Sequence, residues 1–152
     1  MAEGTIERTL VLVKPDGVER GLVGEILARL ERKTLKIVAA KLMTVTPELA
    51  AKHYAEHAGK PFYPGLIAHI TRGPVLALAL EGRSAIAVVR LITGATNPQT
   101  AAPGTIRGDF GSAVTPNLIH ASDSTASAER ELALYFGVAD YQRYERTDRE
   151  FA

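Results

Sequence analysis

The sequence predicts an α+β domain in which a small sheet carries helices on one face. Apolar, β-rich segments alternate with segments of helical periodicity along all 152 residues. Neither glycine-rich fingerprint of nucleotide-binding parallel sheets, G-x-G-x-x-G or G-x-x-x-x-G-K-S/T, occurs. A chain of this length can bury roughly two thirds of the surface that its unfolded form exposes. We therefore expect one domain, spanning residues 1–152.

The first elements are a strand, a helix and a strand. Thr9–Lys14 is nearly all apolar, which predicts a strand buried on both faces and central in its sheet. Pro15-Asp16-Gly17 ends it. Apolar residues at helical spacing then predict an amphipathic helix from Leu22 to about Lys33. Leu35–Val45 returns to strand.

Two helices are predicted next. Thr46 is a suitable N-cap and Pro47 suits the first helical position, so a helix is expected through about His57. A second, shorter helix is predicted over Phe62–Thr71.

The second half repeats the alternation with one long interruption. A strand is predicted over Val75–Leu80 and a helix over Ser84–Ile92, capped by Ser84. Residues 93–115 hold several prolines and glycines and no long apolar period, which predicts a long loop, and loops of this length are usually functional. A last strand over Asn117–His120 and a last helix over Ser124–Phe136 follow. Single helices between strands favour the ferredoxin-like arrangement.

Composition excludes several classes of protein. The chain has no cysteine, which rules out disulfides, thiolate metal sites and cysteine nucleophiles. A net charge of +1 gives no field that would draw the protein onto nucleic acid, so any anion must be bound locally. The N-terminus lacks the apolar core of a secretory signal, and the apolar runs are too short to span a bilayer. We expect a soluble, cytoplasmic protein with no membrane or specific nucleic-acid partner.

His120 is the candidate reactive residue. It lies between an apolar run and the helix-starting residues Ser122-Asp123-Ser124, so its ring is held rigidly yet can be reached. A neutral imidazole nitrogen near pH 7 can accept a phosphoryl group, although a histidine beside a strand is equally compatible with a structural, hydrogen-bonded role.

Three cations favour the interpretation of His120 as a phosphoryl acceptor. Lys14 interrupts an apolar strand, Arg90 ends a helix, and Arg107 lies in a glycine-containing stretch of the long loop. Guanidinium groups bind phosphate through forked donors, and glycines allow close backbone approach.

Motifs spread along the chain share the pattern of one family: Val13-Lys14-Pro15-Asp16-Gly17-Val18 with Arg20-Gly21, His53-Tyr54, Gly73-Pro74-Val75, Thr96-Asn97-Pro98, Pro103-Gly104-Thr105-Ile106-Arg107-Gly108-Asp109-Phe110, and Asn117-Leu118-Ile119-His120 with Ser122-Asp123-Ser124. They resemble the nucleoside diphosphate kinases and occur in family order from residue 9 to about 137. The resemblance implies a ferredoxin-like β-α-β-β-α-β core, with a four-stranded antiparallel sheet covered by helices and an inserted loop near residues 93–115. It also implies transfer of the γ-phosphoryl group from a nucleoside triphosphate, mainly ATP, to nucleoside diphosphates.

The resemblance also implies roles for individual residues. His120 would become phosphohistidine through Nδ1, Glu131 would hold its ring, Ser122 would support that glutamate, and Tyr54 would lie beside the histidine. The expected nucleotide-binding residues are Lys14, Arg90, Arg107 and Thr96 for the phosphates, Lys14 and Asn117 for the ribose, and Phe62, Leu66 and Val114 for the base.

A phosphohistidine predicts ping-pong kinetics, and a base held by stacking and apolar contact predicts broad base specificity. Mg²⁺ held by the nucleotide phosphates would complete the site, with no protein metal ligand. A homo-oligomer, hexamer or tetramer, is expected from the same resemblance.

The chain departs from the family pattern at two places. Ala121 stands where glycine is usual, which would cost roughly 1 kcal/mol if that position needs a positive φ. Thr115-Pro116 replaces Gly-Arg, which removes a donor and a charge next to the site.

Two other interpretations remain open. His53 and His57 stand four residues apart on a predicted helix and could share a metal ion. Alternatively, the chain could be a catalytically silent nucleotide-binding or regulatory module.

Overall fold

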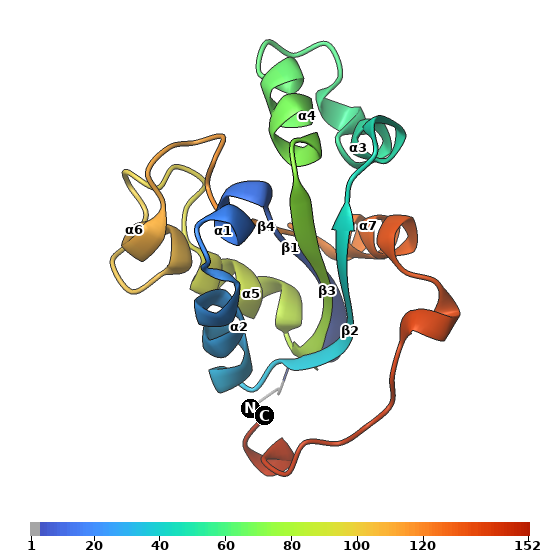
Figure 1. Cartoon of the computed structure of the whole chain (residues 1–152). Coiled ribbons are helices and arrows are strands. Elements are labelled where there is room, and N and C mark those ends of the chain that lie inside the picture. The colour runs from blue at the N-terminus through green and yellow to red at the C-terminus, as the bar shows by residue number, and fades with distance from the viewer. Residues whose placement is uncertain (1–3) are drawn as a thin grey trace.

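The computed structural model describes residues 4–152, so residues 1–3 of the N-terminal segment assessed for a secretory signal lie outside the described part. An antiparallel sheet of four strands in the order β2-β3-β1-β4 forms its centre (Figure 1), which confirms the predicted α+β class. The strands are β1 (Ile6–Val13), β2 (Lys36–Thr44), β3 (Pro74–Arg83) and β4 (Ile119–Ala121). The helices are α1 (Pro15–Glu19), α2 (Val23–Arg32), α3 (Pro47–His53), α4 (Tyr63–Thr71), α5 (Ala85–Thr93), α6 (Ile106–Phe110) and α7 (Thr125–Tyr135), with 3-10 turns at Ala55–His57, Val138–Asp140 and Arg149–Phe151.

Strand β1 is central, as predicted, and its alternating side chains build two separate cores. Leu10 and Leu12 pack in a cluster that includes residues of α3, α4 and α7. Val11 and Val13 face the opposite side, in a cluster that includes residues of α2, α5 and α6. The prediction of helices on one face only is therefore wrong. Both faces carry an apolar layer because β1 is apolar at every position from Leu10 to Val13.

Several predicted boundaries shift for local reasons. Strand β3 continues to Arg83, past the predicted end at Leu80, because β1 pairs with it as far as Ile6. Ser84 does not cap α5 with its side chain: its φ is +48°, and its backbone N–H donates to Thr5 O at 2.9 Å. An N-cap side chain needs an extended backbone to reach back to the first turn.

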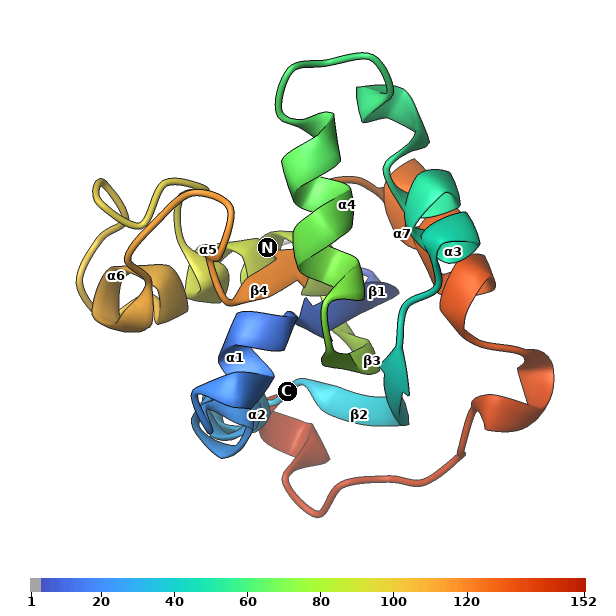
Figure 2. The ribbon, with the colours of Figure 1, turned by 45° about the horizontal axis from the view of Figure 1, so that its top comes forward.

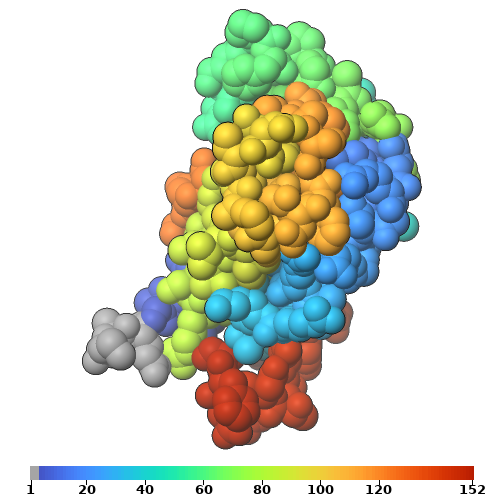
Figure 3. All heavy atoms as spheres, turned by 90° about the vertical axis from the view of Figure 1, so that its left-hand side faces the viewer, coloured from blue at the N-terminus to red at the C-terminus, as the bar shows by residue number. Residues whose placement is uncertain are grey.

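The long loop predicted over residues 93–115 contains the short helix α6. Thr105 caps it, accepting a hydrogen bond from the Gly108 N–H at 3.0 Å. The helix is only five residues long, too short for its apolar period to be recognised in the sequence. Figure 3 shows this segment, yellow to orange, as a lobe between the green α3–α4 region and the blue α1–α2 region.

The arrangement leaves one end of the sheet for a site. Helices α3 and α4 stand beyond that end, while the segment containing α6 lies to one side (Figures 1 and 2). The carboxyl end of β1 and strand β4 lie between them. In the described part of the chain, no helix is both long and apolar enough to cross a membrane.

Candidate active site

A cavity of about 440 Å³ lies at this end of the sheet, between α3–α4 and the 93–117 segment. Nearly all the site residues predicted from the sequence line it: Lys14, Tyr54, Phe62, Leu66, Arg90, Thr96, Arg107, Val114, Asn117, His120 and Glu131. Ser122 is fully buried just behind and reaches the site through Glu131. A larger hollow of about 800 Å³ along β1 and α7 holds none of these residues.

Strand β4 and helix α7 together fix His120. The neighbours of His120 in β4, Ile119 and Ala121, are buried in the α2–α5 core, so alternation turns the imidazole to the opposite face. There His120 Nε2 lies 2.7 Å from Glu131 Oε1. Ser122 Oγ donates to the same oxygen at 2.7 Å, and Arg130 Nη2 lies 3.7 Å from the other carboxylate oxygen.

Glu131 sets the tautomer of His120. Burial alone would raise the pKa of Glu131, but the hydrogen bond and charge of His120 and the hydrogen bond from Ser122 bring its pKa below the usual value. A charged carboxylate can only accept a hydrogen bond, so Nε2 of His120 carries the hydrogen and donates it to Glu131, and Nδ1 keeps its lone pair. Nδ1 has no hydrogen-bond partner within residues 4–152 and is available as a nucleophile.

The ring packed on His120 belongs to His53. Their centroids are 4.5 Å apart in an edge-on arrangement, and Tyr54, predicted to lie beside His120, packs on His53 at 4.6 Å while lining the same cavity. Burial and the neighbouring His120 lower the pKa of His53 to about 3, so His53 is neutral. The sequence signals for this histidine were the motif His53-Tyr54 and its spacing from His57, and it was not predicted as a catalytic or nucleotide-binding residue.

The predicted helix shared by His53 and His57 does not form. Helix α3 ends at His53, and His57 lies in a separate 3-10 turn after Tyr54. The side-chain hydrogen bond of His53 goes to the Tyr135 hydroxyl, 3.0 Å from Nδ1. The interpretation of a metal site on one helix face is therefore wrong.

Lys14, Arg90 and Arg107 converge on the cavity without a carboxylate partner among the described residues. Lys14 Nζ donates to Asn117 Oδ1 at 2.8 Å, and Arg90 Nη1 donates to Ala121 O at 3.0 Å. Arg107 donates to Asn117 O at 3.2 Å, to Gly94 O at 3.2 Å and to Ile119 O at 2.5 Å.

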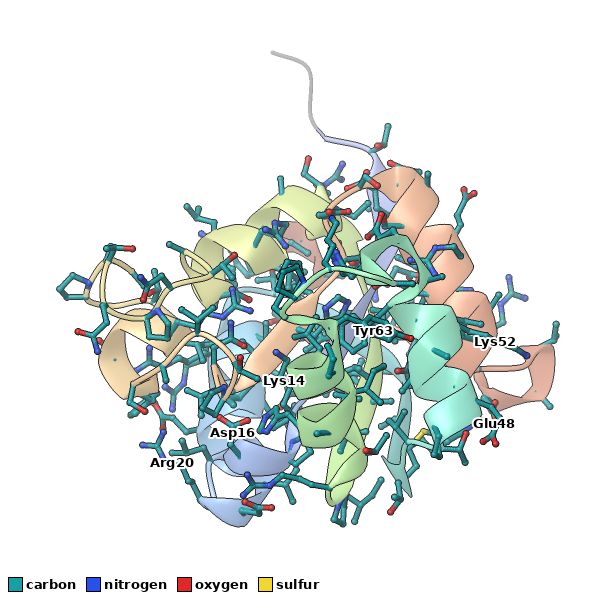
Figure 4. The ribbon with its side chains drawn as sticks, turned by 90° about the horizontal axis from the view of Figure 1, so that it is seen from above. Lys14, Asp16, Arg20, Glu48, Lys52 and Tyr63 are labelled. Atoms are coloured by element: carbon teal, nitrogen blue, oxygen red, sulfur yellow. The ribbon has the colours of Figure 1, made fainter. Side chains whose placement is uncertain are left out.

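Burial and mutual repulsion raise the free energy of these charges. The pKa of Lys14 falls to about 8 because of burial and then Arg107, against the attraction of Asp16. The pKa of Arg107 falls to about 10 because of burial and then Arg90. The direct hydrogen bonds of these groups go to carbonyl and amide oxygens, so a bound anion would relieve the repulsion between the cations. Figure 4 looks down on this end of the molecule, with Lys14 and Asp16 near the centre and Glu48 and Lys52 on the outer helix α3.

Large apolar side chains form the rim of the cavity. Phe62, at the start of α4, is 51% exposed, and Val114, across the cavity on the long loop, is 52% exposed. Leu66 lies one turn after Phe62 on α4. Apolar residues left open to solvent at a cavity mouth suit a flat ring bound between them.

The backbone strain expected at Ala121 occurs at Leu118 instead. Ala121 pairs with Val11 in the sheet, while Leu118 has a φ of +74°. Asp16 Oδ2 accepts the Leu118 N–H at 3.0 Å, and Leu118 O accepts the Lys14 N–H at 2.8 Å. A positive φ costs a leucine roughly 1–2 kcal/mol, and these bonds hold the turn between Asn117 and β4.

Comparison with known proteins gives consistent matches over nearly the whole chain. The family model described as nucleoside diphosphate kinase matches residues 7–141. A nucleoside diphosphate kinase of Archaeoglobus fulgidus is 57% identical, covering 96% of this chain and 97% of the relative. The counterpart of Moorella thermoacetica is 62% identical, covering 89% of this chain and 97% of the relative.

Two solved structures have the same fold. The halophilic nucleoside diphosphate kinase of Halobacterium salinarum in complex with CDP has a TM-score of 0.94 at 50% identity, covering 97% of this chain and 98% of that one. The transition state mimic of the Borrelia burgdorferi enzyme with bound vanadate and ADP has a TM-score of 0.88 at 41% identity, covering 95% of each chain.

Proposed function

This chain belongs to the nucleoside diphosphate kinase family and is an enzyme of that family. We propose that, as a single domain of residues 1–152, it transfers the γ-phosphoryl group from a nucleoside triphosphate, mainly ATP, to nucleoside diphosphates through phosphohistidine on His120. The observation that carries the proposal is the geometry of His120: Glu131 holds Nε2 at 2.7 Å and leaves Nδ1 free in a cavity lined by unpaired cations.

The nucleotide is proposed to lie with its base at the rim and its phosphates inside. Phe62, Leu66 and Val114 would hold the base by its faces, which tolerates any base because each has a π-face. Lys14 and Asn117, joined by their 2.8 Å hydrogen bond, would meet the ribose. The phosphates would be bound by Lys14, Arg90, Thr96 and Arg107. The CDP and ADP bound to relatives support this proposal.

The chemistry consists of two displacements at one phosphorus. The Nδ1 lone pair of His120 forms a bond to the γ-phosphorus, the bond to the bridging oxygen breaks, and its electrons leave with the nucleoside diphosphate. The ring gains positive charge, which the Glu131 carboxylate offsets through the Nε2 proton. A second nucleoside diphosphate then takes the phosphoryl group by the reverse step, which gives ping-pong kinetics. Lys14 and Arg107 would stabilise the charge on the equatorial oxygens of a loose transition state.

Mg²⁺ is proposed to enter with the nucleotide. The cavity lining holds three cations, Lys14, Arg90 and Arg107, and its carboxylates are Glu56, Asp123 and Glu131, of which Glu131 is engaged by His120 and Ser122. Such a donor set suits a magnesium ion held by phosphate oxygens and water. When bound, Mg²⁺ would neutralise charge on the phosphates.

The proposed homo-oligomer, hexamer or tetramer, would use the exposed edge of β2, where Leu42 is 67% exposed. The C-terminal tail forms a hydrogen bond with the first half of β2, where Gln142 N donates to Val38 O at 2.8 Å. A cytoplasmic location is proposed together with these nucleotide substrates.

Labelling tests the proposed intermediate. The wild-type chain incubated with a γ-labelled triphosphate should become an acid-labile, alkali-stable phosphoprotein and lose its label to diphosphates of several bases. His120→Gln should bind nucleotide without labelling, and His57→Gln, a histidine at the same cavity, should still label. Nucleotide binding without labelling of the wild-type chain would instead show a silent module, and equal labelling of His120→Gln would overturn the assignment of His120.

A further inference from the structure

The nitrogen His53 Nε2 is buried and has no hydrogen-bond partner among the described residues. The residue is 3% exposed, and its other nitrogen is occupied by the Tyr135 hydroxyl at 3.0 Å. An unsatisfied buried polar atom raises the free energy of the folded state. The proposed phosphoryl transfer makes no use of this atom, so it is free for another ligand.

Two other residues with metal-binding atoms lie close to His53. The ligand atoms of His53, His120 and Glu131 all lie within 4.8 Å of one another. Two imidazole nitrogens and one carboxylate oxygen are the donor set of an open zinc site, in which three protein ligands leave the fourth position to water. His120 and Glu131 line the cavity, so that fourth position would face the solvent that fills it.

The surroundings suit a metal of this kind. Tyr135 holds the outer nitrogen of His53, and Ser122 holds Glu131 at 2.7 Å. Such outer hydrogen bonds orient metal ligands and fix their tautomers.

We propose that His53, His120 and Glu131 bind one transition-metal dication of the Zn²⁺ class, and that the bound ion inhibits the enzyme. Nitrogen ligands select Zn²⁺ over the Mg²⁺ carried by phosphate oxygens. The site is distinct from any magnesium on the nucleotide because its ligands come from the protein.

Binding replaces a hydrogen bond with two metal bonds. Ligands of a tetrahedral zinc with bonds of about 2.0–2.1 Å lie roughly 3.3 Å apart. His120 Nε2 and Glu131 Oε1, now 2.7 Å apart, must therefore separate slightly. The Nε2 proton of His120 leaves to solvent as the Nε2–metal bond forms, so one proton is released per ion.

A bound metal would remove two functions of the site, one of His120 and one of Glu131. The expected inhibition rests on the proposed function, whereas the metal site does not. The dication withdraws electrons from the His120 ring and weakens Nδ1 as a nucleophile. Glu131, bonded to the metal, no longer offsets the positive charge of the phosphorylated ring. Both effects oppose formation of the phosphohistidine.

Metal titration of the nucleotide-free protein tests the site without using activity. Isothermal titration calorimetry should show one Zn²⁺ bound per chain with release of one proton, and Co²⁺ should give the intense visible bands of a four-coordinate ion. His53→Gln should weaken binding at least tenfold, while the matched variant His57→Gln should leave it unchanged. Equal affinity in His53→Gln, or loss of affinity in His57→Gln, would overturn the site.

A second measurement serves if His53→Gln does not fold. In the wild-type chain, Zn²⁺ should shift the imidazole ¹⁵N resonances of His53 and His120 but not that of His57. Shifts confined to His57, or absent from all three, would refute the proposal.

The activity arm separates the two proposals. With Mg²⁺-nucleotide in excess, Zn²⁺ should slow labelling of His120 in the wild-type chain, less so in His53→Gln, and a zinc-selective chelator should restore it. Zinc binding without any labelling would sink the proposed function and leave the site standing. Labelling of His120 without zinc binding would overturn the metal site and leave the proposed function standing.

Discussion

Replacement of Asp16 should reveal how the strained turn before His120 is held. Asp16 is 7% exposed, accepts the Leu118 N–H at 3.0 Å and lies 3.0 Å from His69 Nε2. Asp16→Ala would leave a buried N–H without an acceptor and a buried histidine without its partner.

The cost can be worked from these two contacts. Each lost contact leaves a buried donor without an acceptor, which costs about 1–3 kcal/mol. We expect Asp16→Ala, which loses both contacts, to lower the free energy of unfolding by about 2–6 kcal/mol. Asp16→Asn keeps an acceptor oxygen for the Leu118 N–H but removes the charge. It should therefore lower the free energy of unfolding by about half as much as Asp16→Ala.

Urea unfolding at one fixed protein concentration measures this effect, because an oligomer would make the midpoint depend on concentration. Asp148→Ala, which removes a half-exposed partner of Arg146, is the matched control and should change stability by less than about 1 kcal/mol. If Asp16→Ala also lowers the free energy of unfolding by less than about 1 kcal/mol, these contacts do not hold the turn.

The same carboxylate predicts a pH dependence. Burial alone would raise the pKa of Asp16, but the hydrogen bond and charge of His69, with the Leu118 N–H, bring it below the usual value. A depressed native pKa contributes stability that is complete above the unfolded pKa of about 3.9 and is lost as the pH falls through the native value. The stability gap between the wild-type chain and Asp16→Asn should therefore narrow below about pH 4. A difference in unfolding free energy between the two chains that stays constant down to pH 2 would contradict a lowered pKa of Asp16.

Three further predictions concern the cavity. Arg107→Ala should lower turnover roughly 100-fold or more because a preorganised charge is lost, and equal rates would exclude its role. Gly108→Ala should destabilise the loop and lower turnover, since an added Cβ would clash with the carbonyl oxygen of Ala102, whereas Gly24→Ala, with nothing within 4 Å, should be neutral or stabilising in thermal melts. Diphosphate affinity, measured calorimetrically, should weaken as the pH rises through about 8, because Lys14 loses its charge there; an affinity that is flat to pH 10 would contradict that role.

Local sequence pattern predicted the elements that depend on their own residues. The unbroken apolar run of β1 requires burial on both faces, which places it inside the sheet, and the structure confirms this. Thr46 and Ser124 mark helix starts and accept the expected capping hydrogen bonds from Leu49 and Ser127. The motifs contain His120, Lys14 and Arg107, and Lys14 stands out because it interrupts an apolar strand.

Contacts between distant segments decided what the pattern could not. The end of β3 depends on its pairing with β1, and the positive φ of Leu118 depends on Asp16 and Lys14, about a hundred residues earlier. No local signal marks a leucine for that conformation, so the strain was expected at Ala121. The site, too, depends partly on local sequence and partly on contacts between distant segments.

The sequence by itself determined most side chains of the site, since the motifs contain His120, Lys14 and Arg107, and the family resemblance assigns roles to Arg90 and Glu131. Only the tertiary structure decided that His53 packs on His120 and keeps an unpaired nitrogen there. The physical reason is distance along the chain: α3, β4 and α7 meet through packing on both faces of one sheet, and their meeting depends on the whole core rather than on any segment of it.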